Sequence, residues 1–327
     1  MNELIINQFK LLIKQIEFDI DFTHGSTQMV NMYRLAAIKK VLNILEKYKS
    51  EIKTIDQLKG IKNLGKKSLE RIGEILKTGK LSEIKIDEDA HKYLAIIEKL
   101  ESIIGIGRKK AYDLFKNHDI KSIDDLKDKL KKHEIELPEN ILKGIKYIDE
   151  IKENIPRNEI DELKEILMNV TREIDPELFG IVCGSYRREQ GTSGDVDFII
   201  TSNKTKNKIN YLEKFITVLK NKNIIIDSLT SDTVPTKYMG IYKLGDNPMR
   251  RIDIRYVPYE SYYSAILYFT GSKDFNKKMR MIAIEMDYTL NEYGLFNNKT
   301  KKKFTINSEK DIFELLNMEY LTPSQRI

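Results

Sequence analysis

Two aspartates separated by one residue, Asp195 and Asp197, stand between a glycine and an apolar run. In a strand, this spacing directs both carboxylates out of the same face. Two acids aimed at one point repel each other unless a divalent cation lies between them, and hard cations such as Mg²⁺ prefer oxygen ligands. For the pair alone, a solvated strand end is the simpler interpretation, so a metal site depends on the residues around it.

The residues just ahead of the pair can bind phosphate. The run GSYRR at residues 184–188 contains a glycine turn, the hydroxyl of Ser185 and the guanidinium of Arg188. An arginine fork matches the oxygen atoms of a phosphate group. These neighbours favour a metal-assisted phosphate site over a solvated strand end.

A second acidic strand is expected downstream. The run RRIDIRY at residues 250–256 alternates with the strand period, so Arg251, Asp253 and Arg255 share one face. Alone, this run indicates an exposed strand with paired charges. If it lies beside the first two aspartates, three carboxylates meet, which is enough to hold two Mg²⁺ ions. Two such ions can activate a hydroxyl nucleophile and stabilise a leaving pyrophosphate.

The elements that must position these residues change character near residue 155. Residues 4–49 keep the three- and four-residue apolar spacing of helices, and further short helices are expected over 121–152. The residue before Pro156 leaves helical space, which marks a boundary. After a helix over 158–173, short apolar runs separated by turns predict strands at residues 178–183, 196–200, 224–226, 238–243 and 252–257. The second half is therefore an α+β region whose sheet carries the acidic residues.

A glycine-centred pattern occurs twice in the first half. The runs NLGKK at residues 63–67 and GIGRK at residues 105–109 each join two expected helices, and basic residues open the second helix. Such a turn exposes backbone N–H groups at a helix N-terminus, where a phosphate can bind. The repeat resembles the helix-hairpin-helix motif, which grips DNA backbones without reading bases.

Charge supports the same interpretation. The chain of 327 residues is long enough for two or three domains, and its net charge is +6. Residues 1–85 hold 16 Lys and Arg against 10 Asp and Glu, a difference of 6 that equals the whole excess. The N-terminal region therefore carries the bias toward polyanions.

Cysteine usage and hydropathy indicate the environment. The single cysteine, Cys183, excludes an intramolecular disulfide framework, and its apolar surroundings predict a buried position rather than a nucleophile. No apolar run approaches the roughly 20 residues of a membrane span, and no signal-peptide pattern is present. We expect a soluble intracellular protein with no membrane partner; nucleus, cytoplasm and viral particle are not distinguished.

The motifs together resemble those of the family X DNA polymerases, of the polymerase beta type. GSYRR, GDVD at residues 194–197, RIDIR at residues 251–255 and YFTGS at residues 268–272 occur in the family's order, and the resemblance covers nearly the whole chain. It implies a multidomain α+β fold in four parts. These are an all-α helix-hairpin-helix domain (1–88) that binds the 5′-phosphate and is similar to a lyase domain, a helical DNA-binding subdomain (89–153), a nucleotidyltransferase palm with a mixed β-sheet (154–259) and a small α+β C-terminal subdomain for nucleotide selection (260–327).

The resemblance also implies a role for each matching residue. Asp195 and Asp197 would bind both metal ions, and Asp253 the catalytic one. Nucleotide contacts would come from Ser185, Arg188, Gly194, Tyr268, Phe269, Gly271, Lys273 and Asn276. DNA contacts would come from Tyr33, Arg34, Gly65, Lys67, Gly105, Gly107, Lys237, Arg251 and Arg280. A polar network of Arg255, Glu292 and Tyr293 would release the acidic site when the C-terminal subdomain closes.

The implied activity is DNA-directed DNA synthesis that fills short gaps during base excision repair. The implied ligands are gapped or nicked double-stranded DNA, a dNTP, two Mg²⁺ ions with Mn²⁺ as an alternative, and a monovalent cation at the hairpin backbones; the protein would act as a monomer. One alternative is a template-independent terminal transferase, but the tight loop at residues 244–248 leaves no segment to take the template's place. Another is a DNA-end-binding scaffold with an inactive palm, against which the three carboxylates argue.

The sequence departs from the family at the 5′-phosphate domain. Arg71 stands where the family has the lysine that forms a Schiff base with an abasic sugar, and a guanidinium stays protonated and cannot form the imine. Lys67, one turn earlier, matches a 5′-phosphate contact. Met29 and Glu83 replace lysines, which predicts a weaker 5′-end pocket, and Lys273 replaces an acid that faces the incoming base. We therefore expect weak or absent deoxyribose-phosphate lyase activity.

Overall fold

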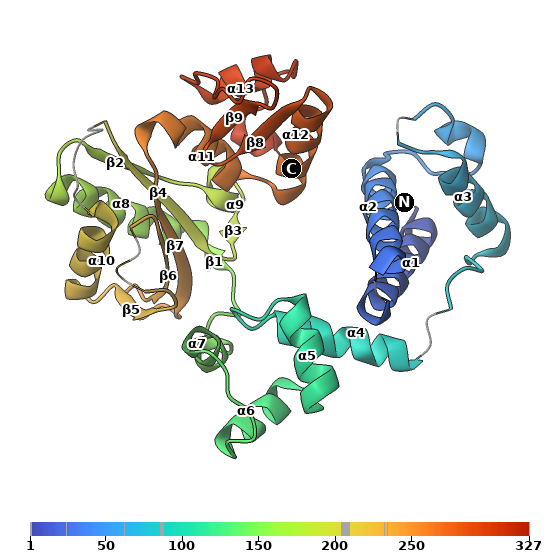
Figure 1. The fold of residues 1–327 in the computed structure, drawn as a ribbon, viewed down its shortest axis with the longest axis horizontal. Helices are drawn as coiled ribbons and strands as arrows, with labels where there is room; N and C mark the ends of the chain where they lie inside the picture. Colours follow the sequence, from blue (N-terminus) through green and yellow to red (C-terminus); the bar gives the residue numbers. More distant parts are fainter. Residues whose placement is uncertain are drawn as a thin grey trace. The chain divides into compact units, whose positions relative to one another are not determined.

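The protein is described from a computed structural model that covers residues 2–23, 25–61, 63–85, 88–203, 210–231, 233 and 235–326. The chain forms two compact units, residues 1–137 and 138–327 (Figure 1). In the described part of the chain, no helix combines the length and apolar character that crossing a membrane requires.

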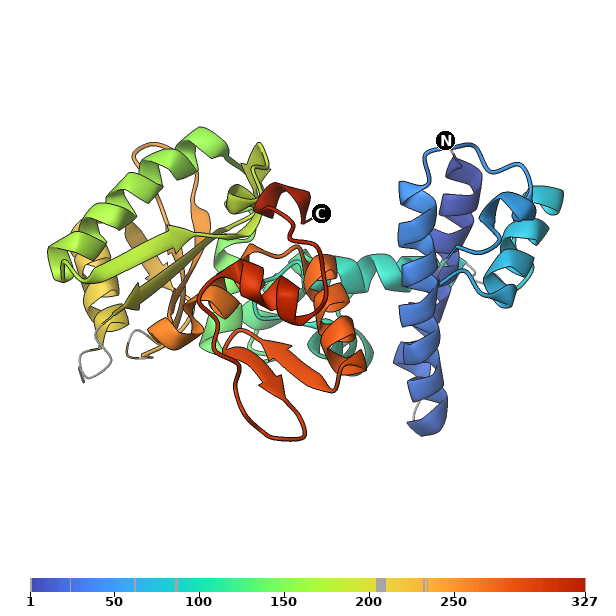
Figure 2. The ribbon, with the colours of Figure 1, turned by 90° about the horizontal axis from the view of Figure 1, so that it is seen from above.

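The first unit is helical, as the apolar spacing predicts. Its helices are α1 (Glu3–Phe22), α2 (Gly25–Lys47), the 3₁₀ turn η1 (Ile55–Leu58), α3 (Lys66–Thr78), α4 (Glu88–Glu101), α5 (Arg108–His118) and α6 (Ile123–Lys131). The long helices α1 and α2 lie side by side (Figure 2). Phe9, Leu12 and Ile16 of α1 pack with Leu45 of α2 and Ile72 of α3 in one buried cluster. Because of this shared core, α1 holds α3 and the turn ahead of it in place.

Two glycine turns confirm the predicted repeat. Gly65 is the N-cap of α3 and Gly107 is the N-cap of α5. Gly105 has a φ of 91°, in the left-handed region where a side chain is strained. In both copies, the N-cap carbonyl accepts the N–H groups of the third and fourth residues after it. The turn therefore leads directly into an exposed helix start, as a helix-hairpin-helix motif requires.

The second unit is built on a mixed five-stranded sheet in the order β2-β4-β7-β6-β5, with β4 and β7 parallel and the other pairs antiparallel. The strands are β2 (Leu178–Val182), β4 (Val196–Ser202), β5 (Ile225–Ser228), β6 (Lys237–Tyr242) and β7 (Arg250–Tyr256). All five predicted strands are confirmed to within two residues at either end, because each has an apolar face with the strand period. A two-residue ladder joins β1 (Ile155–Pro156) to β3 (Thr192–Ser193).

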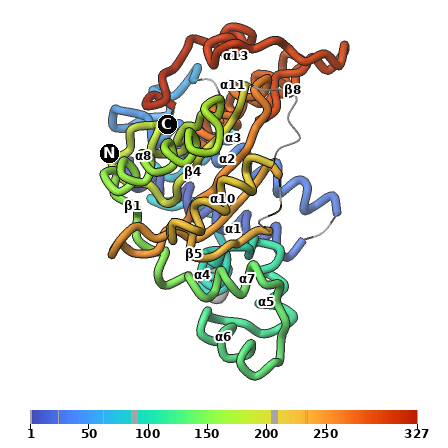
Figure 3. Tube along the Cα trace, turned by 90° about the vertical axis from the view of Figure 1, so that its left-hand side faces the viewer, coloured from blue at the N-terminus to red at the C-terminus, as the bar shows by residue number. Residues whose placement is uncertain are grey.

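Helices cover both faces of this sheet. The helices α8 (Arg157–Ile174) and α10 (Tyr211–Asn221) lie on the same side (Figure 3), where Phe198, Ile252 and Ile254 are fully buried. On the other side, Ile199 packs with Ala265 and Ile266 of α11 (Tyr262–Thr270). Cys183 is buried in that second cluster, as predicted.

The second unit also contains helices, 3₁₀ turns and a hairpin outside the five-stranded sheet. They are α7 (Glu139–Tyr147), α9 (Gly184–Arg187), the 3₁₀ turns η2 (Tyr259–Ser261) and η3 (Pro323–Gln325), α12 (Lys273–Glu285), the hairpin of β8 (Tyr288–Asn291) and β9 (Gly294–Asn297), and α13 (Glu309–Leu315). Phe275, Met279, Leu295 and Phe313 form a separate buried cluster among α12, β9 and α13. The C-terminal part is thus a small α+β subdomain with its own core.

Candidate active site

The second acidic strand lies beside the first, as predicted. Strand β7 is the parallel neighbour of β4, and Asp253 is the direct partner of Asp197 across the ladder. Both aspartates share the strand face of Ile199, on the side covered by α11 and opposite to α8 and α10. The register therefore brings two carboxylates together at the centre of the sheet.

The surroundings of the two partnered carboxylates oppose their ionisation. Burial, followed by the negative charge of Asp253, raises the pKa of Asp197 to about 7, although the guanidinium groups of Arg255 and Arg188 act in the opposite direction. Burial also raises the pKa of Asp253, against the nearby cations of β6 and β7. Ionising these acids without a cation is unfavourable, and a bound cation would stabilise their ionised form.

The third aspartate is engaged elsewhere. The carboxylate of Asp195 is paired with the guanidinium of Arg251, whose Nε lies 3.9 Å from Oδ1 of Asp253. As a result, the described residues contain no group of three or more His, Cys, Asp or Glu side chains placed to hold a metal ion. The cationic side chain of Arg251, predicted as a DNA contact, lies among the acids instead.

The donor set nevertheless fits a divalent cation. Among the described residues, Oδ1 of the buried Asp253 has no hydrogen-bond partner. Gly184 has a φ of 59°, and a Cβ atom there would lie 2.5 Å from Oδ2 of Asp197, so only glycine leaves this oxygen free. Carboxylate oxygens alone are the ligands of Mg²⁺ and Mn²⁺ rather than of softer metals. Asp197 and Asp253 could hold such an ion, and Asp195 could join them once it is separated from Arg251.

The predicted phosphate-binding residues lie next to these acids. The short helix α9 carries Ser185 and is followed by Arg188, whose Nη1 donates a hydrogen bond to the carbonyl of Thr270. A Cβ atom on Gly271 would lie 3.2 Å from the same nitrogen. Gly194 lies between β3 and β4, two residues before β4 begins. The structure therefore brings Arg188 and Gly271 together although they are far apart in the sequence.

The predicted base and sugar contacts form one cluster in the C-terminal subdomain. The Asn276 side chain donates a 2.6 Å hydrogen bond to the carbonyl of Tyr268, and the Arg280 guanidinium lies 4.9 Å from the Tyr268 ring centre. The Arg255 guanidinium lies 5.0 Å from the ring centre of Phe269. Lys273 is the first residue of α12, the helix that also carries Asn276 and Arg280. These side chains bind one another where the resemblance predicts contacts with nucleotide and template.

The residues of the predicted polar network come from two separate segments of the second unit. Within the described residues, Nε of Arg255 has no hydrogen-bond partner. Glu292 and Tyr293 lie in the turn between β8 and β9, where the carbonyl of Tyr293 accepts a hydrogen bond from Ser261 and its side chain is exposed. Lys237 lies on β6, opposite Arg255 in the ladder.

A buried charge cluster connects the phosphate-binding helix to the C-terminal subdomain. Glu309, at the start of α13, accepts hydrogen bonds from Arg187 of α9 at 2.6 and 3.0 Å and from Arg326 at 2.6 Å. The Arg326 side chain is fully buried and Glu309 is 7% exposed. Burial raises the pKa of Glu309, but the hydrogen bonds and charges of the two arginines outweigh this effect and leave the pKa below its usual range. Sequence reasoning missed this cluster.

The predicted DNA-binding residues of the first unit fall into two groups. Gly65, Lys67, Gly105 and Gly107 are exposed at the two hairpins, and Tyr33 on α2 is 72% exposed. Arg34, in contrast, is bound within the unit. Its guanidinium donates a 2.8 Å hydrogen bond to Glu83.

Glu83 also binds Arg71, the residue at the position of the expected lysine. The Arg71 guanidinium contacts both oxygens of Glu83, and its side chain is 18% exposed. Burial acts to raise the pKa of Glu83, whereas the two arginines lower it more strongly. The two departures recognised separately in the sequence are therefore one ion pair. The available signal was their complementary charge: an arginine and an acid each occupy a position where a lysine was expected.

Comparison with known proteins agrees with this arrangement. The family model described as DNA polymerase beta palm matches residues 154–259, the one described as DNA polymerase beta thumb matches residues 265–327, and a helix-hairpin-helix domain model matches residues 2–81.

Curated relatives match along most of the chain. DNA polymerase lambda of Arabidopsis thaliana is 30% identical, over 91% of this chain and 60% of the relative. DNA polymerase lambda of Rattus norvegicus is 26% identical, over 90% and 52%. DNA nucleotidylexotransferase of Xenopus laevis is 25% identical, over 99% and 68%. The chain spans between about half and two thirds of the length of these relatives.

Proposed function

Because the chain belongs to family X of the DNA polymerases, we propose that it is a DNA-directed DNA polymerase that fills short gaps during DNA repair. The observation that carries this proposal is the register that places Asp197 opposite Asp253, next to Arg188. Nucleotidyl transfer needs acids that can hold cations near a primer hydroxyl, together with a cationic group for the triphosphate.

The proposed roles follow from these positions. Asp195, Asp197 and Asp253 would hold divalent cations, which supply charge neutralisation and activate the primer hydroxyl when bound. Arg188 and the turn at Ser185 would bind the triphosphate. Arg251 must then move from Asp195, and a DNA phosphate offers its guanidinium an alternative anion.

The two hairpins would bind the backbone of gapped or nicked duplex DNA. Their turns expose glycines and helix starts in a region with excess positive charge. We propose that a monomer with parts 1–88, 89–153, 154–259 and 260–327 performs this function, with Mg²⁺ or Mn²⁺ at the acidic site and a monovalent cation at each hairpin.

Primer extension on a one-nucleotide gap tests the proposal. We expect templated insertion of one complementary dNTP that requires added Mg²⁺ and is abolished by Asp253→Ala, since the partner of Asp197 is removed. The control is the wild-type protein on the same gap with an abasic template position. Insertion that does not depend on the template base would contradict a DNA-directed activity, and insertion by Asp253→Ala would contradict the proposed site.

Terminal transfer is a second candidate, favoured by the similarity to a DNA nucleotidylexotransferase. The connection between β6 and β7 argues against it, because only residues 243–249 separate these strands. The decisive measurement is extension of a single-stranded primer by the wild-type protein. We expect no product under conditions in which the gap is filled.

The lyase prediction is tested by borohydride trapping on an incised abasic site. We expect little covalent adduct, because the Arg71 guanidinium is held by Glu83 and stays protonated. Lys67→Ala serves as the matched variant, since Lys67 is the exposed lysine one turn away. A strong adduct in the wild-type protein that Lys67→Ala removes would show that Lys67 performs the chemistry instead.

A further inference from the structure

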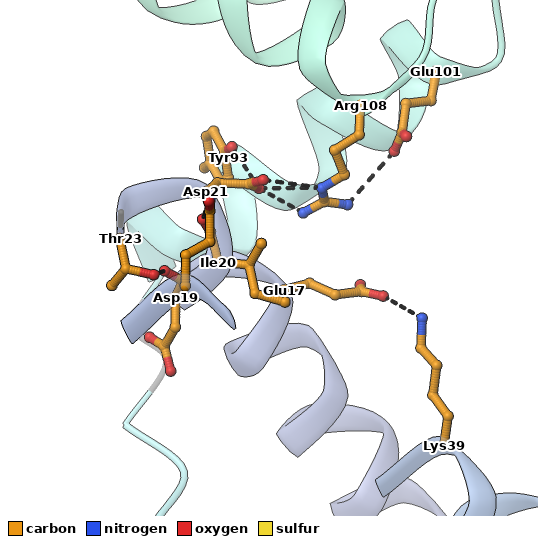
Figure 4. Close-up of polar contacts among 10 residues, drawn as sticks. Glu17, Asp19, Ile20, Asp21, Thr23, Lys39, Tyr93, Glu101 and Arg108 are labelled. Carbon is orange, nitrogen blue, oxygen red and sulfur yellow. Dashed lines mark hydrogen bonds and ion pairs between the residues drawn. The ribbon is translucent and has the colours of Figure 1, made fainter. Parts of the chain in front are cut away.

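The end of α1 contacts the second hairpin subdomain through a buried carboxylate (Figure 4). Asp21, whose side chain is 7% exposed, accepts a 2.7 Å hydrogen bond from the hydroxyl of Tyr93 on α4. It also accepts hydrogen bonds from Arg108 on α5, at 2.6 Å from Nη2 and at 3.2 Å from Nε. The carboxylate is thus satisfied by two residues of the other hairpin.

Aromatic rings from α1, α4 and α5 pack against one another beside this ion pair. Ring centres lie 5.1 Å apart for Phe22 and Tyr93, 5.8 Å for Phe22 and Tyr112, and 5.0 Å for Tyr93 and Phe115, all edge to face. Phe18 of α1 adds a further edge contact to Tyr93. Apolar burial around a charge pair strengthens its mutual attraction and makes either charge alone costly.

Arg108 is the first residue of α5, where a DNA-gripping hairpin presents its cations to a phosphate. Here its guanidinium is directed back to α1 and also lies 3.5 Å from Glu101 (Figure 4). The exposed Lys109 beside it remains directed toward solvent. The first residue after the second hairpin therefore has two acidic partners inside the protein.

The contact connects the two hairpins through rigid elements. The first hairpin leads into α3, which shares a buried core with α1. The second hairpin lies between α4 and α5, which hold Asp21 of α1 through Tyr93 and Arg108. Without this contact, fewer side-chain contacts would join α1, and with it the first hairpin, to α4 and α5.

We propose that Asp21, Tyr93 and Arg108 form an anchor that fixes the separation of the two hairpins and thereby selects the length of DNA gap that the protein binds. This inference rests on the proposed function. A gap places the phosphates of its two flanks at a separation set by the number of missing nucleotides. When the hairpins are held at one separation, both engage only on a gap of matching length, and simultaneous engagement multiplies the affinity.

The test is binding of duplexes with gaps of one, two, four and six nucleotides and a downstream 5′-phosphate, measured by fluorescence anisotropy with the full chain. We expect the wild-type Kd to be lowest at one gap length, by about tenfold or more relative to the least favoured gap. Asp21→Asn should flatten this profile to within about twofold, because the separation is no longer fixed. Glu46→Gln is the matched control and should keep the wild-type profile, since Glu46 forms an exposed pair with Lys10 between α1 and α2.

A second variant distinguishes loss of the anchor from misfolding. Asp21→Asn combined with Arg108→Gln removes both charges, leaves no buried charge unpaired, and should show the same flat profile with wild-type circular dichroism. A wild-type profile in the folded double variant would overturn the anchor. Failure of the proposed function gives a different result, since a wild-type protein that shows gap-length selection but inserts no nucleotide would support the anchor and contradict the polymerase.

Discussion

Replacing Asp197 with asparagine is expected to abolish nucleotide insertion and, at pH 8 in EDTA, to stabilise the protein. The wild-type carboxylate is buried beside Asp253, and burial with that neighbouring charge raises its pKa to about 7. Ionised Asp197 therefore opposes folding in the absence of a cation. The asparagine removes this opposition, which we expect to increase the free energy of unfolding on the order of 2 kcal/mol.

The gain in stability from Asp197→Asn should increase as the pH rises. The folded-state pKa of about 7 lies above the unfolded value, so the folded wild-type protein binds more protons and loses stability as pH rises between about 4 and 7. Asp197→Asn lacks this loss. Its advantage should be absent near pH 4, grow through pH 7 and then remain constant, as measured by urea unfolding in EDTA.

The rate of nucleotide insertion by Asp197→Asn should fall by about a thousandfold or more, because the variant loses one of the carboxylates that we propose hold the divalent cations. Asp246→Asn, in the exposed loop between β6 and β7, is the control and should change neither property. If Asp197→Asn is less stable than the wild type at pH 8, or is stabilised equally at pH 4 and pH 8, then ionised Asp197 does not destabilise the folded protein.

Glu309→Gln is expected to destabilise the protein by about 3–5 kcal/mol, which is the range for removing one partner of a buried ion pair. The glutamate accepts hydrogen bonds from Arg187 and from the fully buried Arg326, and an amide leaves both guanidinium groups without a counter-charge. Urea unfolding at pH 7 measures the loss. The wild-type stability that depends on Glu309 should be present above the unfolded pKa of about 4.3 and decline as pH falls further, because its folded-state pKa is lowered.

Glu314→Gln is the matched control on the same helix. Glu314 pairs with Lys310 at 3.5 Å, and both side chains are largely exposed, so its removal should cost less than about 1 kcal/mol. Equal losses in the two variants would mean that the buried cluster contributes no more than a surface pair.

The sequence predicted those features that leave a local periodic signal. The alternation of β7 predicted that Asp253 shares a face with Arg251 and Arg255, and the structure pairs Asp253 with Asp197 of β4. The hairpins were recognised because glycine is needed at fixed offsets from a helix start. Both signals are contained within a few neighbouring residues.

Charge pairs between distant segments left no such signal. Arg187 lies 122 residues from Glu309, and Arg108 lies 87 residues from Asp21. A surface of many lysines and glutamates offers each cation many alternative partners, and only packing decides among them. The DNA contacts that the resemblance implies for Arg251 and Arg34 stay predictions, and in the structure both residues pair with acids of the chain.

The ion pair of Arg71 and Glu83 has a consequence for how this sequence can diverge. Lysine at position 83 alone would place three cations together, because Arg34 contacts the same carboxylate. Lysine at position 71 alone would still meet the acid and remain protonated beside it. We therefore expect that neither single exchange gives a reactive amine at position 71. Positions 71 and 83 are therefore coupled, and the effect of a change at one depends on the residue at the other.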